Sequence, residues 1–327
     1  MNETPAGTRA TGSQRTPNGQ VRAKPIATPS HVDAHVPRPL ILLRWLLGHL
    51  PLVAGRRIAT AIGLACYWVL PGWRRRALRN MRRVLGPEAG RVAVRRAARG
   101  VFRNVALNYY DLVRASDLGP RQLGREVEVD DFAWRRLMDY LDAGHPVLIV
   151  SAHFGAIDIV GRIVAARGVR PVLIVAPVGP PWAVAMLQWL RTRNGWELLD
   201  PAEGLAAVRR LRATLTGGRM VFLMTDRTPA GTGIPAPFAG GSIWMSTTPA
   251  RLALQRGALV VPAFCRRVGA GYVVDIQAPL NPPGEPPPDA ATLTRRIAAV
   301  GAAAIRRDPA QWLLLAPGWD DSARRDR

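Results

Sequence analysis

A histidine and an aspartate follow a run of apolar residues in the stretch HPVLIVSAHFGAID, which spans residues 145–158. The run VLIVS predicts a buried strand that ends at Ser151, and ligands of open α/β sheets bind beyond the carboxyl ends of the strands. His153 therefore stands where a site is expected, and Gly155 permits a close approach of the backbone. A neutral imidazole at such a place can accept a proton, which is the chemistry of a general base.

Asp158 follows His153 by five residues, which on an ideal helix is a rotation of about 500°, so the two side chains would not share a helix face. They can meet only if His153 lies in the turn before the helix and Asp158 lies in its first turn. Asp158 would then bond one ring nitrogen and leave the other free to act as a base. The alternative is a structural pair, in which a strand-end histidine is satisfied by a helix-capping aspartate.

A second acidic residue follows another expected strand. Asp226 and Arg227 come after the apolar run MVFLMT, so we expect them on the same edge of the sheet as His153. Asp226 could orient His153 instead of Asp158 or together with it, and Arg227 could bind a phosphate or an oxyanion. An ordinary ion pair in a surface turn is the alternative for both residues.

Short apolar runs alternate with helical stretches from residue 146 onward. The expected strands are VLIVS, PVLIVAP, MVFLMT, LVVPAF and YVVDIQ, and the expected helices lie near 157–168, 182–194, 203–216, 247–256 and 290–307. Residues 91–143 also have apolar positions at helical spacing. This alternation predicts an α/β fold with a central, largely parallel sheet flanked by helices.

The region before residue 90 has a different character. Two apolar stretches, 40–54 and 58–70, are each shorter than the ~20 residues that span a bilayer, and Arg56 and Arg57 separate them. Trp73 and a cluster of arginines follow: Arg74, Arg75, Arg76, Arg79, Arg82 and Arg83. This combination is typical of helices that lie in the interface of an anionic membrane leaflet, although a core hairpin followed by a solvated basic helix is the alternative.

The expected organisation is therefore a disordered tail over 1–39, membrane-associating helices over 40–90, an α/β domain over 91–315 and a charged tail over 316–327. The first segment is rich in Pro, Thr, Gly and Ser and has no signal-peptide core, so we expect no export. We expect peripheral or monotopic attachment to the cytoplasmic face of the inner or plasma membrane.

The charge balance suggests a polyanionic partner. The 327 residues contain 45 Lys+Arg and 23 Asp+Glu, which gives a net charge of +22. Such a chain should bind an anionic membrane, an acidic protein or a nucleic acid. The two cysteines form neither a disulfide framework nor a metal-ligand pattern.

Several segments together resemble one enzyme family. HFGAID matches the His-x4-Asp/Glu motif of the glycerolipid acyltransferase superfamily, and the closest likeness is to its bacterial lipid A lauroyl/myristoyl and phosphatidylinositol mannoside acyltransferases. LRNMRRVLG, LRTRNGWELL, DPAQW and the long block from GGRMVFLMTDR to GALVVPAF also resemble that branch. The likeness covers roughly residues 40–315.

The resemblance implies that an acyl chain moves from a thioester of acyl carrier protein or coenzyme A to a hydroxyl of a lipid. The acceptor would be a lipid A-type glycolipid, a phosphatidylinositol mannoside or a lysophospholipid. In this interpretation His153 is the base and Asp158 holds its tautomer, with Asp226 as the second candidate. The expected substrate-binding residues are Phe154, Gly155, Arg191, Arg227, Phe238 and Gly240. No metal and no cofactor besides the thioester donor is expected.

Two other functions remain open from the residues alone. A hydrolase of lipid esters or thioesters could use the same histidine through water, since only water exclusion separates transfer from hydrolysis. A nucleic-acid-binding protein would fit the charge, but the chain has no zinc-ligand pattern and its densest arginine cluster adjoins apolar helices. We therefore expect no nucleic acid partner.

Overall fold

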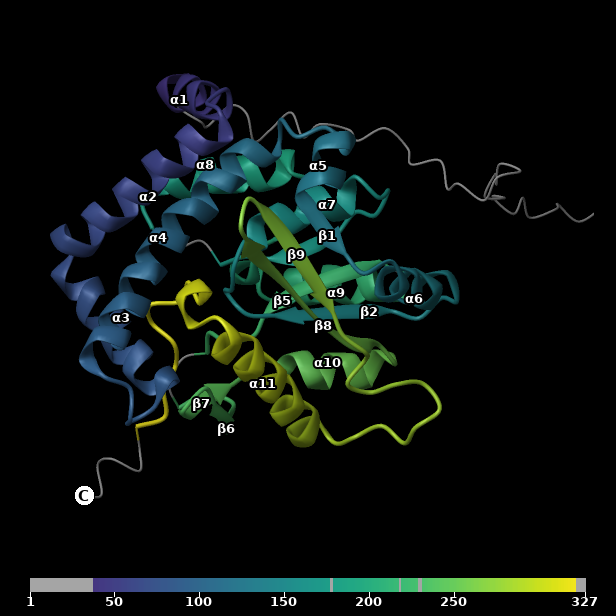
Figure 1. The fold of residues 1–327 in the computed structure, drawn as a ribbon. Coiled ribbons are helices and arrows are strands. Elements are labelled where there is room, and N and C mark those ends of the chain that lie inside the picture. Colours follow the sequence, from purple (N-terminus) through teal and green to yellow (C-terminus); the bar gives the residue numbers. More distant parts are fainter. Residues whose placement is uncertain (1–37, 177–178, 218, 229–230, 322–327) are drawn as a thin grey trace, which may run out of the picture.

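The computed structural model describes residues 38–176, 179–217, 219–228 and 231–321. Within these residues a seven-stranded sheet has the order β1-β9-β8-β2-β5-β3-β4, and all neighbouring strands are parallel except β8 and β9. This confirms the predicted α/β fold (Figure 1). The strands are β1 (Val127–Val129), β2 (Val147–Ser151), β3 (Val172–Ile174), β4 (Glu197–Leu199), β5 (Met220–Met224), β8 (Leu259–Val268) and β9 (Gly271–Ile276).

Helices pack on both faces of the sheet, and α1 to α4 lie together along one side of the molecule (Figure 1). The helices are α1 (Arg38–Gly48), α2 (Leu52–Val69), α3 (Pro71–Leu85), α4 (Arg91–Ala115), α5 (Pro120–Glu126), α6 (Asp131–Asp142), α7 (Val160–Ala165), α8 (Pro181–Arg193), α9 (Leu205–Thr216), α10 (Thr248–Arg256) and α11 (Ala290–Arg307). A 3-10 turn, η2 (Ile157–Ile159), precedes α7. The expected tail over 1–39 lies outside the described residues, apart from its last two residues, which begin α1.

Burial on both faces explains why the central strands are continuous apolar runs. Leu148 and Val150 of β2 point into a hydrophobic cluster shared with α9, α10 and α11. Val147 and Ile149 point into a second cluster shared with α6 and α7. The sheet is thus the middle layer of a helix–sheet–helix arrangement, and its carboxyl edge is free to carry a site.

The N-terminal helices form an outer layer along α4 (Figure 1). The two apolar stretches of the sequence do not correspond to two helices, because α2 runs through Arg56 and Arg57 and the break falls between α1 and Leu52. Arg56 can stay within the helix because its guanidinium turns inward and donates to the carbonyl of Ala270 and the hydroxyl of Tyr272. By length and composition, α2 is the one described helix that could cross a membrane, and 22% of it is buried in the protein.

The described chain remains packed beyond residue 315, where the sequence suggested the start of a charged tail. The indole N–H of Trp319 donates to Asn80 at 2.9 Å, and the backbone of residues 318–320 bonds to the antiparallel hairpin of β6 (Ile234–Phe238) and β7 (Gly241–Met245). Trp319 is buried in this contact. The packed region therefore extends at least to Asp321, and residues 322–327 lie outside the described residues.

Candidate active site

His153 and Asp226 meet at the carboxyl edge of the sheet. β2 and β5 are parallel neighbours with Ser151 opposite Met224, so the residues that follow these strands emerge side by side. The His153 Nδ1 atom lies 2.8 Å from Asp226 Oδ1. The backbone N–H of His153 also donates to both carboxylate oxygens, at 3.1 and 3.0 Å. The pair is therefore fixed by the side chain and the backbone together.

The two groups shift each other's proton affinity. Burial lowers the pKa of His153, but the charge of Asp226 and the hydrogen bond to it outweigh burial, so the pKa lies above its ordinary value. Burial raises the pKa of Asp226, but the charge of His153 and the hydrogen bonds from His153 and Trp312 hold it below its ordinary value. The carboxylate is fully buried, whereas 36% of the imidazole side chain is exposed. Asp226 therefore stays ionised while the histidine can reach a ligand.

Asp158 has other partners than His153. Its carboxylate accepts hydrogen bonds from Arg191 Nε at 2.8 Å and from Asn108 Nδ2 at 2.8 Å. Burial raises its pKa, but Arg191 and Asn108 outweigh that effect and hold the pKa below its ordinary value. The expected hydrogen bond between Asp158 and His153 is therefore not found. The physical reason is that η2 directs Asp158 toward α4 and α8, so of the two carboxylates weighed from the sequence, Asp226 is the one bonded to His153.

Two cavities meet at His153. A cavity of about 450 Å³, here called the arginine cavity, has Asp158, Gln188, Arg191 and Arg227 among its lining residues. A groove of about 640 Å³, here called the apolar groove, runs between α2 and α4, with Ile62 and Trp73 among the side chains along it. His153, Arg227 and Tyr109 line both of them. A long apolar ligand and a polar ligand could thus reach the same imidazole from two directions.

Phe154 and Gly155 lie in the site loop but line neither cavity. Phe154 is buried and packs edge-on against Phe264, with 6.2 Å between ring centroids. Gly155 has φ +64, and a Cβ there would lie 2.0 Å from the carbonyl oxygen of Cys265. Both residues therefore hold the loop against β8 and line neither of the two cavities described here.

Phe238 and Gly240, expected from the sequence at a substrate lip, also lie away from both cavities. Phe238 is buried against Trp312, with 5.8 Å between ring centroids. A Cβ on Gly240 would lie 1.9 Å from the carbonyl oxygen of Arg83. The hairpin of β6 and β7 thus packs on α11, and its tip is close to the backbone of α3.

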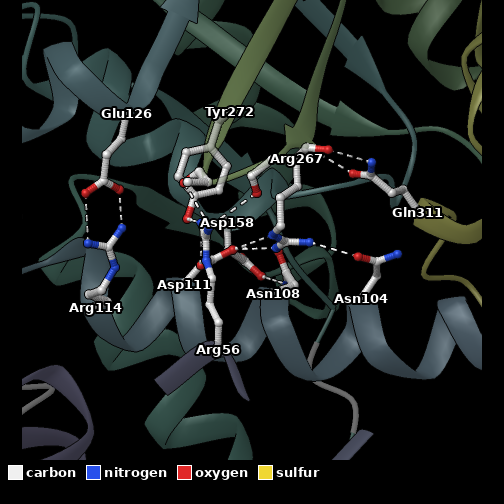
Figure 2. A network of polar contacts seen from close by, with 12 residues as sticks. Arg56, Asn104, Asn108, Asp111, Arg114, Glu126, Asp158, Arg267, Tyr272 and Gln311 are labelled. Atoms are coloured by element: carbon white, nitrogen blue, oxygen red, sulfur yellow. Dashed lines mark hydrogen bonds and ion pairs between the residues drawn. The ribbon is translucent and has the colours of Figure 1, made fainter. Parts of the chain in front are cut away.

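A buried polar network lies behind the site loop (Figure 2). Asp111 of α4 is paired with Arg267 of β8, and Arg56 of α2 lies 3.9 Å from the same carboxylate. The Gln311 amide donates to the carbonyl of Arg267 at 2.9 Å and accepts from its N–H at 2.8 Å. The network therefore ties α2, α4, the sheet and the segment after α11 into one unit.

Other catalytic chemistries find little support in the described residues. No group of three or more His, Cys, Asp or Glu side chains there could hold a metal ion. Burial raises the pKa of the Cys265 thiol to about 12, so this thiol is protonated at neutral pH and is a poor nucleophile. A histidine whose Nδ1 is held by a buried carboxylate has a fixed tautomer, and such an arrangement is able to act as a general base.

Sequence reasoning missed three residues of this site. Asn108 and Tyr109 lie on α4, and only the amphipathic pattern of that helix was read from the sequence. Trp312 donates its indole N–H to Asp226 at 2.8 Å, whereas the sequence marks DPAQW only through a resemblance. All three residues lie far from His153 in the chain, so no local sequence pattern predicts that they are near it in the fold.

Comparisons of the sequence with known proteins point to one family of enzymes. The sequence model described as bacterial lipid A biosynthesis acyltransferase matches residues 39–320. A phosphatidylinositol mannoside acyltransferase of Mycolicibacterium smegmatis is 27% identical over 243 residues, which cover 74% of this chain and 78% of that protein. A protein of the same name from Mycobacterium tuberculosis is 26% identical over 270 residues, covering 78% and 80% of the two chains.

Proposed function

The chain belongs to the bacterial lipid A biosynthesis acyltransferase family and is an acyltransferase, and we propose that it acylates a hydroxyl of a membrane glycolipid with His153 as general base. The observation that carries the proposal is the bond between His153 Nδ1 and the buried Asp226. Because Nδ1 is occupied, Nε2 is the nitrogen that can take a proton from a substrate.

The chemistry follows from this geometry. Nε2 of His153 removes the proton of the acceptor hydroxyl while the hydroxyl oxygen attacks the carbonyl carbon of the thioester. The carbon–sulfur bond then breaks, and the thiolate takes the proton from His153, so the imidazole is neutral again. Asp226 stabilises the intervening imidazolium without being protonated itself. Arg227 lines both cavities and supplies positive charge near the oxyanion or a phosphate.

The two cavities suit the two substrates. The apolar groove is lined mainly by hydrophobic side chains of α2 and α4, and His153 is among its lining residues, so it fits the fatty acyl chain. The arginine cavity contains the Arg191–Asp158 pair and Gln188, which suit a sugar hydroxyl or a phosphate. The acceptor is accordingly a glycolipid, and the names of the two mycobacterial relatives favour a mannosylated inositol lipid.

Membrane attachment is supported by the N-terminal helices, which turn some of their arginines inward and expose many apolar side chains. Arg44 of α1 and Arg56 of α2 turn inward to Asp117 and Asp111. Apolar side chains face outward instead: Leu42, Trp45, Leu46, Val53, Ile58, Ile62, Trp68, Val69 and Trp73 are all exposed. Together with the arginines of α3, this surface suits an anionic leaflet on the cytoplasmic side.

The donor is a fatty acyl thioester, carried by acyl carrier protein or coenzyme A. Both carriers are anionic, and the net charge of +22 favours either of them over a neutral thioester. No other cofactor enters the proposed reaction. The strong positive charge thus serves the membrane and the donor, and no nucleic acid is needed to explain it.

A transfer assay tests the proposal. Purified protein in mixed vesicles is given radiolabelled acyl coenzyme A or acyl carrier protein, with and without a phosphatidylinositol mannoside. The proposal predicts labelled, acylated glycolipid that depends on the acceptor, with little free fatty acid. Release of free acid at the same rate with or without acceptor would instead indicate a hydrolase, and acylation of lysophospholipid alone would overturn the acceptor class.

A further inference from the structure

The carboxylate of Asp226 has one more partner than the proposed dyad uses. The indole N–H of Trp312 donates to Asp226 Oδ2 at 2.8 Å, while Oδ1 lies at the imidazole. Both oxygens of the buried carboxylate are therefore bound by side chains, Oδ1 by the imidazole and Oδ2 by the indole, and the His153 backbone N–H donates to both of them. A hydrogen bond to an ionised acceptor is among the stronger ones in proteins and has a preferred direction. The indole thus fixes the plane in which the carboxylate meets the ring.

Trp312 is itself held firmly. Its ring is fully buried between Phe238 and Trp319, with 5.8 Å between centroids in each case. On either side of it the backbone bonds directly to the site loop: Gly155 N–H donates to the carbonyl of Gln311 at 2.8 Å, and Leu313 N–H donates to the carbonyl of His153 at 2.7 Å. Residues 311–313 therefore lie beside residues 153–155 as a short antiparallel bridge.

This bridge is anchored to the network behind the site. The Gln311 side chain bonds the backbone of Arg267 in both directions, and Asn104 Nδ2 donates to the carbonyl of Ala310 at 2.9 Å. Arg267 is paired with the buried Asp111 (Figure 2). The segment that carries Trp312 is thus held by hydrogen bonds to α4 and β8, and a residue that sets the geometry of a catalytic pair needs such support.

We infer that Trp312 is a positioning residue that acts on the reaction through Asp226, holding the carboxylate in the orientation that makes His153 an effective base. This inference rests on the proposed function of the His153–Asp226 pair. Trp312 lines neither cavity, so it has no contact with substrate through which to act. Substitution of Trp312 should therefore change the turnover rate and the proton affinity of His153, but not the binding of substrate.

The direction of the pH effect follows from the hydrogen bonds. Besides Asp226, the charged and titratable groups around His153 are Arg227 after β5, Asp158 on η2, Tyr109 on α4 and Arg191 on α8. None of them changes when the indole N–H is removed. Without the indole N–H, the negative charge of the Asp226 carboxylate is shared with one donor fewer and attracts a proton on the imidazole more strongly. The backbone N–H of His153 still holds the carboxylate in place. The imidazolium is then favoured, and the acid limb of the rate profile should move to higher pH.

Trp312→Phe is the test, and Trp319→Phe is its matched control. Trp319 is a buried tryptophan in the same cluster, but its indole N–H donates to Asn80 and not to the dyad. Trp312→Phe should lower kcat about tenfold, as expected for one hydrogen bond to a charged group, and raise the acid limb by roughly half a pH unit or more. The KM for the thioester should stay unchanged, and Trp319→Phe should keep the wild-type kcat and profile. A Trp312→Phe enzyme that matches this control would overturn the inference.

A substitution at a fully buried position can also fail to fold, so a measurement on the wild-type protein accompanies it. One of the ten indole N–H resonances should titrate with the midpoint of the acid limb and lose this titration in Asp226→Asn. If no indole resonance follows that midpoint, the inference fails while the dyad can still stand. Full activity of His153→Ala would instead remove the proposed function itself, so the two failures are distinguishable.

Discussion

At the scale of single residues, the raised pKa of His153 has a consequence for activity. The imidazole must be neutral to accept a proton, so activity falls as the pH drops through its pKa. Because Asp226 raises that pKa, the acid limb of kcat/KM should lie above about 6.5, the ordinary value for histidine. Wild-type profiles with an acid limb clearly below that value would contradict the assignment.

Asp226→Asn should show what the negative charge of Asp226 contributes, because asparagine has nearly the same shape but no charge. The amide removes the negative charge that favours the imidazolium, so the acid limb should move to lower pH. The maximal rate should nevertheless fall by a factor of about a hundred to ten thousand, because an amide cannot stabilise the imidazolium. Steady-state rates across pH 5–9 measure both effects, and an unchanged maximal rate would show that Asp226 does not orient the base.

Asp158→Asn should act mainly on stability. The substitution leaves Arg191 poorly paired in a largely buried place, and breaking a buried ion pair costs about 3 kcal/mol. Since the pKa of Asp158 is lowered on folding, its contribution is complete above the unfolded pKa of about 3.9 and is lost as the pH falls through the folded pKa. Urea unfolding should therefore show a difference from wild type at pH 7 that shrinks below pH 4.

The sequence named both residues of the dyad but could not pair them. His153 and Asp226 each follow an apolar strand, which is a local signal. Their contact depends on β5 lying next to β2, although β3 and β4 come between them in the chain. The resemblance to the His-x4-Asp motif favours Asp158 as the partner of His153, yet η2 directs Asp158 to Arg191 and Asn108. The order of the strands in the sheet, and not closeness in the chain, therefore decides which carboxylate bonds to His153.

At the scale of elements, α2 carries the argument for the membrane. Val69 is 73% exposed near the end of α2 and is not among the residues that line the apolar groove. Val69→Glu should weaken binding to anionic vesicles about tenfold or more, because a buried apolar contact is replaced by a charge. Vesicle co-sedimentation measures this.

Leu205 offers the matched control for that experiment. It is 78% exposed on α9, which Figure 1 places well away from α2. Leu205→Glu makes the same kind of change on a surface that we do not assign to the membrane. Equal losses in the two variants, or no loss in Val69→Glu, would contradict the orientation proposed here.

The elements that the sequence predicted are those with a strong pattern. The five expected strands correspond to β2, β3, β5, β8 and β9, whose apolar runs are buried in the sheet. β1 and β4 have three residues each, too few to show a period. β6 was missed because Pro235 and Pro237 argue against a strand; both occupy exposed positions of a two-stranded hairpin, where a missing N–H is tolerated.

At the scale of the whole molecule, the site lies where the apolar groove meets the polar arginine cavity. The N-terminal helices present apolar and basic residues outward, the apolar groove leads inward between α2 and α4, and His153 stands where this groove meets the arginine cavity. In the function proposed above, this order would let a lipid remain partly in the membrane while its hydroxyl reaches His153. Composition and the N-terminal pattern predicted the outer surface, whereas the cavities depend on side chains from distant elements and could not be foreseen.

The central claim is that His153 is the base for acyl transfer, and the most direct measurement is turnover of His153→Ala in protein shown to be folded. The account predicts that thioester-dependent acylation of the glycolipid falls by a factor of about a hundred to ten thousand, while the melting temperature and the affinity for the thioester stay close to wild type. A folded His153→Ala protein that acylates the acceptor at a near-normal rate would contradict it.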